Sequence, residues 1–173
     1  LNDLNGINRY NYIFGNSDDI MKLSNAQDML LSIVKINNIL HSMYLYMDDS
    51  DFILTSNQGV IHMDNFADTG WMEAYFRYKQ TKAGPAWLPT RTVRYSKSNT
   101  SGELGTSNKV ITFFYTHTPY IARVNGVLVF NIYEESIRKL INSKSSISEG
   151  YIEIVNADGD VISHVQDNLV GSN

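Results

Sequence analysis

Apolar residues recur at spacings of three and four positions in the first quarter of the chain, which is the period of an amphipathic helix with a wide apolar face. These positions are Met29, Leu30, Ile33, Ile36, Leu40 and Met43. Ser17 is suited to cap the start of the helix, and Asp18 and Asp19 follow in the first turn, where carboxylates meet the positive end of the helix dipole. We predict one continuous helix over 20–42, within an N-terminal unit of residues 1–42 that packs across a sheet.

After the helix the period shortens to that of extended strands. The predicted strands cover 42–47, 52–63 with a bend at Gly59, 90–96, 109–121 and 126–133. A short helix is predicted over 68–81, capped by Asp68 or Thr69, with a loop over 82–89 after it and a last helix over 134–143. Short connections between consecutive strands favour antiparallel pairing. The pattern therefore predicts an α+β fold, a long N-terminal helix packed on a five-stranded antiparallel sheet.

Residues 150–164 repeat the layout of residues 42–56. Both segments contain an extended run with a tyrosine near its start, an acidic turn, and an aliphatic pair followed by a polar residue. The repeat is either a general hairpin pattern or the start of a second copy of the module. We divide the chain according to the second interpretation, into a main lobe over 43–148 and an incomplete second lobe over 149–173.

Charge and composition exclude several classes of function. The 173 residues carry a net charge of -4 at pH 7 and no cluster of Lys or Arg, so no nucleic-acid partner is expected. The absence of cysteine excludes thiol chemistry and disulfides, and fits both the cytosol and the outer surface of bacteria that use few disulfides. No apolar run reaches the roughly 20 residues of a membrane span. Because the chain starts at Leu1, we interpret it as a soluble piece of a longer protein.

The sequence contains no recognisable catalytic or metal-binding motif. The four histidines, His41, His62, His117 and His164, do not share the spacing of metal ligands, and no acidic residue completes a catalytic triad. Residues 156–161 resemble the start of a calcium loop but lack its bidentate glutamate, so a turn between strands is expected. We therefore expect no catalysis, no cofactor and no bound metal.

Aromatic residues and one polar residue in an apolar strand supply the candidate ligand site. Asn131 interrupts the apolar run 126–133, and because an unpaired buried amide costs about 1–3 kcal/mol, it needs a partner. Arg91 is placed to hold a ligand anion or to pair with a surface carboxylate. Tyr115 and His117 share one face of a strand, and parity alone does not say which face is inward. The candidate ligand-binding residues are Trp71, Tyr75, Trp87, Arg91, Tyr115 and Asn131, with Tyr46 and His117 as secondary candidates.

The order of short segments along the chain resembles a known family. The segments are "SMYLYMDDSDFILTSNQGV", "FADTGWMEAY", "AWLPTR", "TFFYTHTP" and "GVLVFNIYEESIRKLI". Together they resemble the extracytoplasmic Cache family, specifically the membrane-distal lobe of double-Cache (dCache) sensors, over nearly the full chain. The resemblance implies a PAS-like fold with a ligand pocket on the sheet face opposite the long helix. It also implies that Asn131 binds a ligand or pocket water there, whereas the alternative ties the amide to neighbouring backbone or a tyrosine hydroxyl.

The resemblance also implies a function. Such domains are the ligand-sensing, non-catalytic parts of transmembrane histidine kinases, chemoreceptors and membrane-anchored AraC-type regulators, and the parent protein of this chain would carry the output domain. The expected location is extracytoplasmic, on a parent anchored in the membrane. Part of the long helix is expected to pair with the same helix of a second subunit. The alternative is a secreted or surface carbohydrate-binding or adhesion module without a signalling role.

Two departures from the family pattern bear on the ligand. Amino-acid-sensing relatives carry Asp at the strand position of Asn131, and an Arg shortly before the aromatic residue that corresponds to Trp71. Here Asp68, Thr69 and Gly70 precede Trp71, so both charged clamps are missing. We therefore expect a sugar or short oligosaccharide first, a small organic acid second and a free amino acid third.

Overall fold

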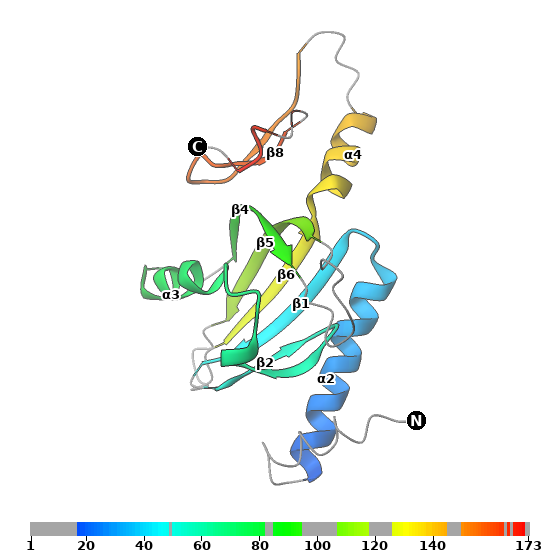
Figure 1. Ribbon diagram of the computed structural model, residues 1–173, viewed down its shortest axis with the longest axis vertical. Coiled ribbons are helices and arrows are strands. Elements are labelled where there is room, and N and C mark those ends of the chain that lie inside the picture. The colour runs from blue at the N-terminus through cyan, green and yellow to red at the C-terminus, as the bar shows by residue number, and fades with distance from the viewer. Residues whose placement is uncertain are drawn as a thin grey trace, which may run out of the picture.

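The computed structural model describes residues 17–48, 50–81, 85–94, 107–117, 126–144, 150–164, 166 and 168–171. The helices of this part are α2 (Ser17–Ile36), α3 (Met72–Thr81) and α4 (Glu134–Lys144), with a short 3-10 turn η1 (Met63–Asn65). The strands are β1 (Leu40–Met47), β2 (Phe52–Thr55), β3 (Gly59–His62), β4 (Pro85–Arg94), β5 (Ser107–His117), β6 (Gly126–Tyr133), β7 (Ile154–Val155) and β8 (Val161–Ser163) (Figure 1).

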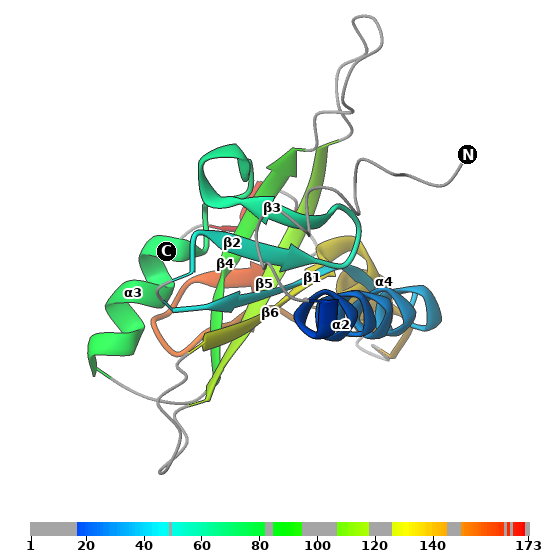
Figure 2. The same ribbon diagram turned by 90° about the horizontal axis from the view of Figure 1, so that it is seen from below.

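The first six strands form one antiparallel sheet in the order β3-β2-β1-β6-β5-β4. Figure 2 shows α2 and α3 on opposite sides of this sheet. The predicted α+β class, with an N-terminal helix packed on an antiparallel sheet, is therefore confirmed.

Side chains alternate between the two faces of the sheet and build two cores. On the face covered by α2, here called the helix face, Leu30 of α2 packs with Met43 and Ile132. On the opposite face, here called the site face, Trp71 and Tyr75 pack with further aromatic and branched side chains from β1, β5 and β6. The sheet is thus covered by side chains on both faces, which explains why its central strands alternate so weakly between polar and apolar residues.

The sheet has six strands rather than the five predicted, because the segment over 52–63 is a hairpin and not one bent strand. Gly59 has φ of 75°, a left-handed conformation that glycine adopts without steric cost. Thr55 Oγ1 accepts the Gln58 N–H at 3.0 Å and donates to the Gly59 carbonyl at 3.0 Å, so one hydroxyl closes the turn. β2 and β3 then pair antiparallel, with Thr55 opposite Gly59.

The prediction of one helix over 20–42 is wrong at its C-terminal end. α2 ends at Ile36, and the Asn37 side-chain oxygen accepts the Ile39 N–H at 3.3 Å while the Leu40 N–H bonds to the Asn37 carbonyl at 3.0 Å. This local turn competes with further helix, which is the usual behaviour of asparagine at such a position. Leu40 and Met43 consequently belong to β1 and not to the apolar face of the helix.

The apolar residues of α2 fall on two stripes and not on one wide face. Leu30 is buried on the sheet, with Ala26 and Val34 partly buried beside it. Met29 and Ile36 are exposed by 60% and 87% and point away from the sheet. Only the first stripe therefore stabilises the packing of α2 on the domain.

The predicted loop over 82–89 is largely a strand, because β4 begins at Pro85. β4 is the edge of the sheet, so a proline there costs no ladder hydrogen bond on its outer side. The register of β4 against β5 shifts between Leu88 and Arg91, which marks a bulge at Pro89 and Thr90. The bulge changes the direction in which Arg91 points.

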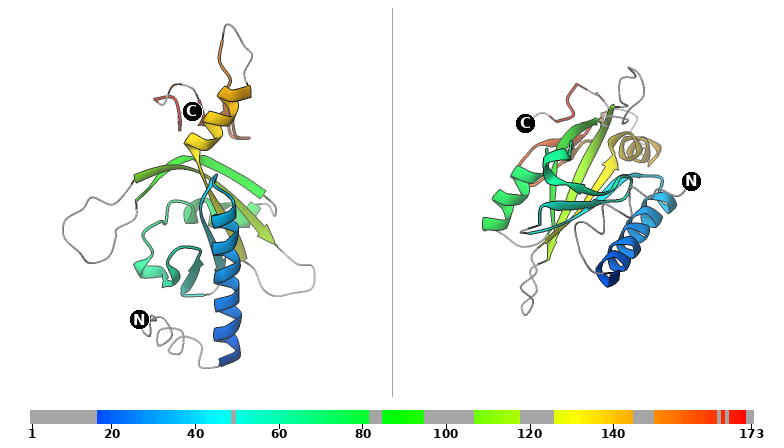
Figure 3. Two further views of the ribbon diagram at one scale, coloured as in Figure 1. Left: turned by 90° about the vertical axis from the view of Figure 1, so that its right-hand side faces the viewer. Right: turned by 60° about the horizontal axis from the view of Figure 1, so that its bottom comes forward.

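The C-terminal segment forms the predicted hairpin. β7 and β8 pair antiparallel, and the Asn156 side-chain oxygen accepts the N–H groups of Asp158 and Asp160 at 2.9 Å each, which confirms a turn at 156–161. The hairpin lies beside α4, at the end of the sheet away from the start of α2 (Figure 3). Ile162 of β8 is buried in the core of the helix face.

Candidate functional site

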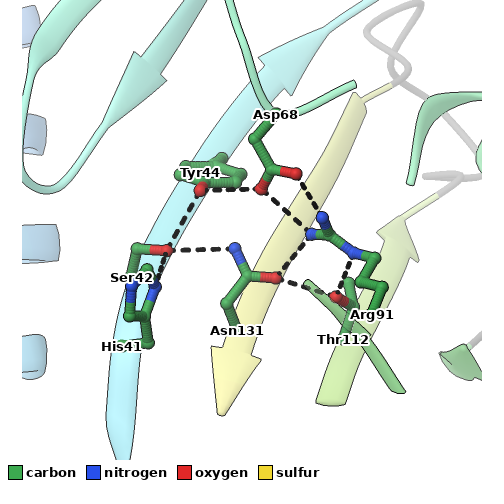
Figure 4. Close-up of polar contacts among 7 residues, drawn as sticks. All are labelled: His41, Ser42, Tyr44, Asp68, Arg91, Thr112 and Asn131. Carbon is green, nitrogen blue, oxygen red and sulfur yellow. Dashed lines mark hydrogen bonds and ion pairs between the residues drawn. The ribbon is translucent and has the colours of Figure 1, made fainter. Parts of the chain in front are cut away.

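Five side chains on the site face close a ring of hydrogen bonds, here called the polar ring. Its members are Ser42 and Tyr44 of β1, Asp68 of the loop before α3, Arg91 of β4 and Asn131 of β6. Figure 4 shows these side chains converging from four separate segments. Aromatic side chains pack against the polar ring, since Tyr44 contacts both Phe66 and Trp71.

The hydrogen bonds of the polar ring follow one another without a break. Ser42 Oγ donates to the Tyr44 hydroxyl at 3.1 Å, and Tyr44 donates to Asp68 Oδ2 at 2.9 Å. Arg91 Nη2 donates to Asp68 Oδ2 at 3.0 Å and to Asn131 Oδ1 at 2.9 Å. Asn131 Nδ2 returns to Ser42 Oγ at 3.0 Å. Each member therefore holds two others in position, which restricts its rotamer.

A buried ion pair lies at the centre of the ring. Arg91 Nη1 also bonds to Asp68 Oδ1, so the guanidinium and the carboxylate meet in a two-pronged contact. The two side chains are exposed by only 16% and 5%. Arg91 Nε donates to Thr112 Oγ1 at 2.8 Å, which fixes the plane of the guanidinium. The site thus contains one positive and one negative group, each largely removed from water.

Asn131 is fully buried and its amide is bonded entirely to protein side chains. Its oxygen accepts from Arg91 and, at 2.8 Å, from Thr112 Oγ1, and its nitrogen donates to Ser42. These partners are neither backbone groups nor a tyrosine hydroxyl, so they differ from those named in the alternative, and three side chains hold the amide instead. Asn131 therefore positions Arg91, and its own contribution to ligand binding stays a prediction.

Aromatic rings cover the polar ring. Trp71 and Tyr75 are buried, with ring centroids 6.1 Å apart, and Tyr46 lies 6.3 Å from Trp71 and 6.2 Å from Tyr75. Trp71 Nε1 is buried and has no hydrogen-bond partner among the described residues. Because buried donors are almost always paired, this N–H is a place where a bound solute would gain a contact that the protein leaves open.

The loop that carries Asp68 and the start of α3 are fixed by a second acidic residue. The Tyr75 hydroxyl donates to Asp48 Oδ1 at 2.7 Å, and Lys79 pairs with the same carboxylate. Burial raises the pKa of Tyr75 well above 10, and the bond to Asp48 adds to the shift, so the hydroxyl stays protonated. α3 is thereby tied to the turn between β1 and β2.

His41 extends the polar ring on the side of Ser42. Its Nδ1 is 3.0 Å from Ser42 Oγ and its Nε2 is 3.4 Å from Asn108 Nδ2. The imidazole of His41 meets the ring of Tyr133 edge to face, with the two ring centroids 5.0 Å apart. Burial lowers the pKa of His41 below its usual 6.5, Asp68 opposes this shift and Arg91 adds to it.

The structure brings together five of the eight predicted site residues. Trp71, Tyr75, Arg91, Asn131 and Tyr46 all lie on the site face. The side chain of His117 lies outside the described part of the chain.

Trp87 and Tyr115 lie on the opposite face from Asn131. Trp87 pairs with Phe113 across the strands, and their rings are 4.7 Å apart on the helix face. Tyr115 is three positions from Thr112, whose hydroxyl bonds to Asn131, so strand alternation turns it the other way. Both side chains are nearly half exposed. The structure thus separates these two predicted residues from the polar ring.

Sequence reasoning missed the residues that complete the cluster. Asp68 was expected only to cap the short helix, and Ser42, Tyr44, Thr112 and His41 were not assigned to the site. The charged groups that amino-acid-sensing relatives carry are indeed absent from their positions, but Asp68 and Arg91 supply one charge of each sign from other positions. The parity of Ser42 and Tyr44 with Tyr46 was a usable signal for the strand members.

No group of three or more His, Asp or Glu in the described part is arranged to hold a metal ion. Among the helices that the structure describes, none combines the length and apolar character needed to cross a membrane.

Comparisons with solved structures identify the fold. The periplasmic sensory domain of the Campylobacter jejuni chemoreceptor Tlp1 matches with a TM-score of 0.55 and 13% identity, over 97% of this chain and 65% of that one. The extracellular domain assigned to a histidine kinase, soHK1S-Z6, matches with a TM-score of 0.54 and 12% identity, over 95% and 63%. The ligand-binding domain of the Pseudomonas fluorescens chemoreceptor CtaA in complex with L-leucine matches with a TM-score of 0.52 and 16% identity, over 90% and 64%.

This chain therefore has the PAS-like, Cache-type fold of extracytoplasmic sensory domains, as the resemblance implied. It spans less than two thirds of each of these three structures. No protein-family model matches the sequence, and a search of curated proteins gives no match.

Proposed function

We propose that this chain is the extracytoplasmic ligand-sensing domain of a transmembrane signalling receptor, and that it binds an α-amino acid at the polar ring. The observation that carries the proposal is the buried Asp68–Arg91 pair, on the same sheet face as the buried N–H of Trp71, which has no hydrogen-bond partner among the described residues. A buried ion pair adds little to stability compared with apolar packing, and an orphaned buried donor reduces stability. Their presence together on a sensory-domain fold is most simply explained by a ligand.

The charges of the pair select the ligand class. If a ligand carboxylate takes the place of Asp68 on the guanidinium, Asp68 is left buried without a cation, which is strongly unfavourable. A zwitterion avoids this cost, because its ammonium pairs with Asp68 while its carboxylate pairs with Arg91. A simple organic acid places two carboxylates against one guanidinium, and an organic amine leaves Arg91 unpaired.

The indole N–H of Trp71 gives the same ligand a third contact. Trp71 follows Asp68 by three residues, and its indole packs against the rings of Tyr46 and Tyr75. A carboxylate oxygen or a backbone-like carbonyl is a suitable acceptor for it. The surrounding rings offer apolar faces to the side chain of the ligand.

The charges of the Asp68–Arg91 pair reverse the order of ligand classes expected from the sequence. A free amino acid now comes first, and sugars and organic acids follow. The complex of the CtaA domain with L-leucine supports this order, although that ligand is a property of CtaA. The sensory-domain neighbours also favour a signalling role over the alternative adhesion module.

Ligand entry requires movement of α3 and the loop before it. Asp68 and Trp71 are buried, so the present arrangement is closed over the polar ring. α3 is held to the sheet by its buried aromatic side chains and by the contacts of Tyr75 and Lys79 with Asp48. Breaking these few contacts opens the ring without unfolding the sheet.

Two contacts connect the site with the C-terminal hairpin, which we propose is the start of a second lobe over 149–173. Thr90, the neighbour of Arg91 in the bulge, donates its hydroxyl proton to the Ile162 carbonyl of β8. Glu134, directly after β6, accepts from Ser163 Oγ at 2.8 Å and is itself buried. A shift of β4 or β6 on ligand binding is therefore transmitted to β8.

A calorimetric and thermal-shift screen tests the proposal. The panel holds the common L-amino acids, their decarboxylated amines, their deaminated acids and a set of sugars. A zwitterion at ten times its Kd should stabilise the domain by about 1.4 kcal/mol, and the matched amine and acid should bind at least tenfold more weakly. Arg91→Gln should abolish the gain, whereas Trp87→Ala on the helix face should keep it. Tight binding of a sugar or of a deaminated acid contradicts the proposal.

A further inference from the structure

We propose that His41 adjusts the charge of the polar ring with pH. Neutral His41 leaves the ring balanced for a zwitterion, and protonated His41 makes it favour a monoanion. The consequence for binding rests on the function proposed above. The coupling between His41 and Asp68 is a property of the ligand-free chain and stands on the hydrogen bonds alone.

The bonds between His41 and Asp68 run in one direction. An ionised Asp68 only accepts, so Tyr44 uses its single hydroxyl proton on Asp68 Oδ2, 2.9 Å away. The Tyr44 oxygen then accepts from Ser42 Oγ at 3.1 Å. Ser42 has now used its only proton, so His41 Nδ1, 3.0 Å from the serine oxygen, must carry a proton of its own.

The other nitrogen of His41 leads to the same assignment. Nε2 faces Asn108 Nδ2, a donor, at 3.4 Å, so in the neutral ring Nε2 is the acceptor. Neutral His41 is therefore the Nδ1–H tautomer. The hydrogen bonds then run from donor to acceptor in the order His41, Ser42, Tyr44, Asp68. Protonation adds a proton at Nε2, which forces the Asn108 amide to turn its oxygen toward the imidazole.

The local backbone directs His41 into this position. The register of β1 against β6 shifts between Leu40 and Ser42, so His41 is the extra residue of a bulge. The edge-to-face contact with Tyr133 on β6 holds the other side of the imidazole. The charged groups whose fields act on His41 are Asp68 and Arg91, which belong to the site itself.

Protonation of His41 changes the charge balance that selects the ligand. With neutral His41, the site carries one negative and one positive group, and a zwitterion matches both. With charged His41, the same region carries a net positive charge, which attracts a ligand carboxylate and repels a ligand ammonium. For charges separated by several ångströms in a partly buried site, we expect a change in the monoanion-to-zwitterion affinity ratio of roughly five- to tenfold.

Nuclear magnetic resonance of the ligand-free chain tests the coupling over a range of about pH 4.5 to 8, which brackets the titration of histidine. The nitrogen chemical shifts of His41 report its tautomer. The chemical shift of the Asp68 carboxyl carbon reports the other end of the hydrogen-bond path. We expect the Nδ1–H tautomer above the midpoint, and an inflection of the Asp68 carbon at the His41 midpoint. Neutral His41 in the Nε2–H form overturns the proposal without any variant.

Two variants interrupt the hydrogen-bond path from His41 to Asp68 at different residues. Tyr44→Phe keeps the aromatic ring and removes the hydroxyl, and Ser42→Ala removes the first link. In each, His41 should still titrate, while the inflection at Asp68 should fall to less than half its wild-type size. An unchanged inflection in either folded variant, judged by its amide spectrum, contradicts the proposal. Because no ligand is added, a failure of amino-acid binding would contradict the proposed function and leave this result unaffected.

Discussion

Ser42 of β1 and Asn131 of β6 lie opposite each other in the sheet, and the Asn131 amide donates to the Ser42 hydroxyl over 3.0 Å. This contact joins β6 to β1, which are neighbours at the centre of the sheet although they are far apart in the sequence. It also places the Asn131 oxygen against Arg91 and Thr112. The amide that interrupts an apolar strand is thus the support on which the charged pair rests.

Replacement of Asn131 should therefore destabilise the domain. Asn131→Ala removes one hydrogen bond from each of the Ser42 hydroxyl, the Thr112 hydroxyl and Arg91 Nη2, and we expect a loss of about 1–3 kcal/mol in the free energy of unfolding. Urea unfolding followed by circular dichroism measures it. Asn57→Ala, in the exposed turn between β2 and β3, is the matched control and should change stability by less than about 0.5 kcal/mol. Equal stability of the two variants would show that the polar ring does not form.

The Asp68–Arg91 pair should behave as a coupled unit. Asp68→Asn alone leaves the guanidinium of Arg91 without its counter-charge. Arg91→Gln alone leaves the carboxylate of Asp68 without its counter-charge. Each single change should cost about 2–3 kcal/mol, less than for a wholly buried pair because Arg91 is 16% exposed. The double variant should be more stable than the sum of the single effects predicts, by at least about 1 kcal/mol. Additive effects in the same unfolding experiment would mean that the two side chains do not interact.

The stability of the domain should decrease in mild acid through His41. Burial lowers the pKa of His41 in the folded chain below 6.5, its unfolded value, so the unfolded chain takes up this proton first. The contribution of neutral His41 to the free energy of unfolding is fully present above pH 6.5, and it is lost as the pH falls through the pKa of His41 in the folded chain. The urea midpoint of the wild type should fall more steeply below pH 6.5 than that of His41→Gln. Parallel pH profiles for the two chains would contradict the assignment.

The exposed stripe of α2 should mediate self-association. Met21, Met29 and Ile36 are exposed by 64%, 60% and 87% and follow one side of the helix, away from the stripe that packs on the sheet. Sedimentation over a concentration series should show a monomer–dimer equilibrium. Met29→Glu should shift it toward monomer by tenfold or more in Kd, whereas Ser24→Glu, on a different side of the same helix, should not. A monomer at all concentrations would exclude pairing by α2 in the isolated chain.

Periodicity located most of the helices and strands, but it missed the first half of β4 and joined β2 and β3 into one strand, and local turn chemistry set the ends of the elements. The i, i+3, i+4 pattern continued from α2 into β1 because Leu40 and Met43 happen to follow it. The side chain of Asn37 ends the helix before that point. In the same way Gly59 reads as a bend in sequence, but its positive φ makes it the turn of a hairpin.

The site was harder to predict, because it depends on which face each strand residue takes. Strand parity placed Tyr115 and His117 on one face without saying which face is inward, and it is the hydrogen bond of Thr112 to Asn131 that shows the site on the face opposite Tyr115. The bulge before Arg91 breaks the alternation of β4, so parity counted from Trp87 fails there. Asp68 reaches Arg91 only through the folded loop, and no sequence spacing records that contact.

The indole N–H groups give the most direct test of amino-acid binding at the polar ring, since the chain has only two tryptophans and they lie on opposite faces of the sheet. A proton–nitrogen spectrum recorded during titration with the L-amino acid that most raises the melting temperature follows both signals at once. We expect the Trp71 Nε1–H signal to move downfield as it gains an acceptor, while the signal of Trp87 stays in place. A bound amino acid that leaves Trp71 unmoved, or that moves Trp87 instead, would contradict the assignment of the polar ring as the ligand site.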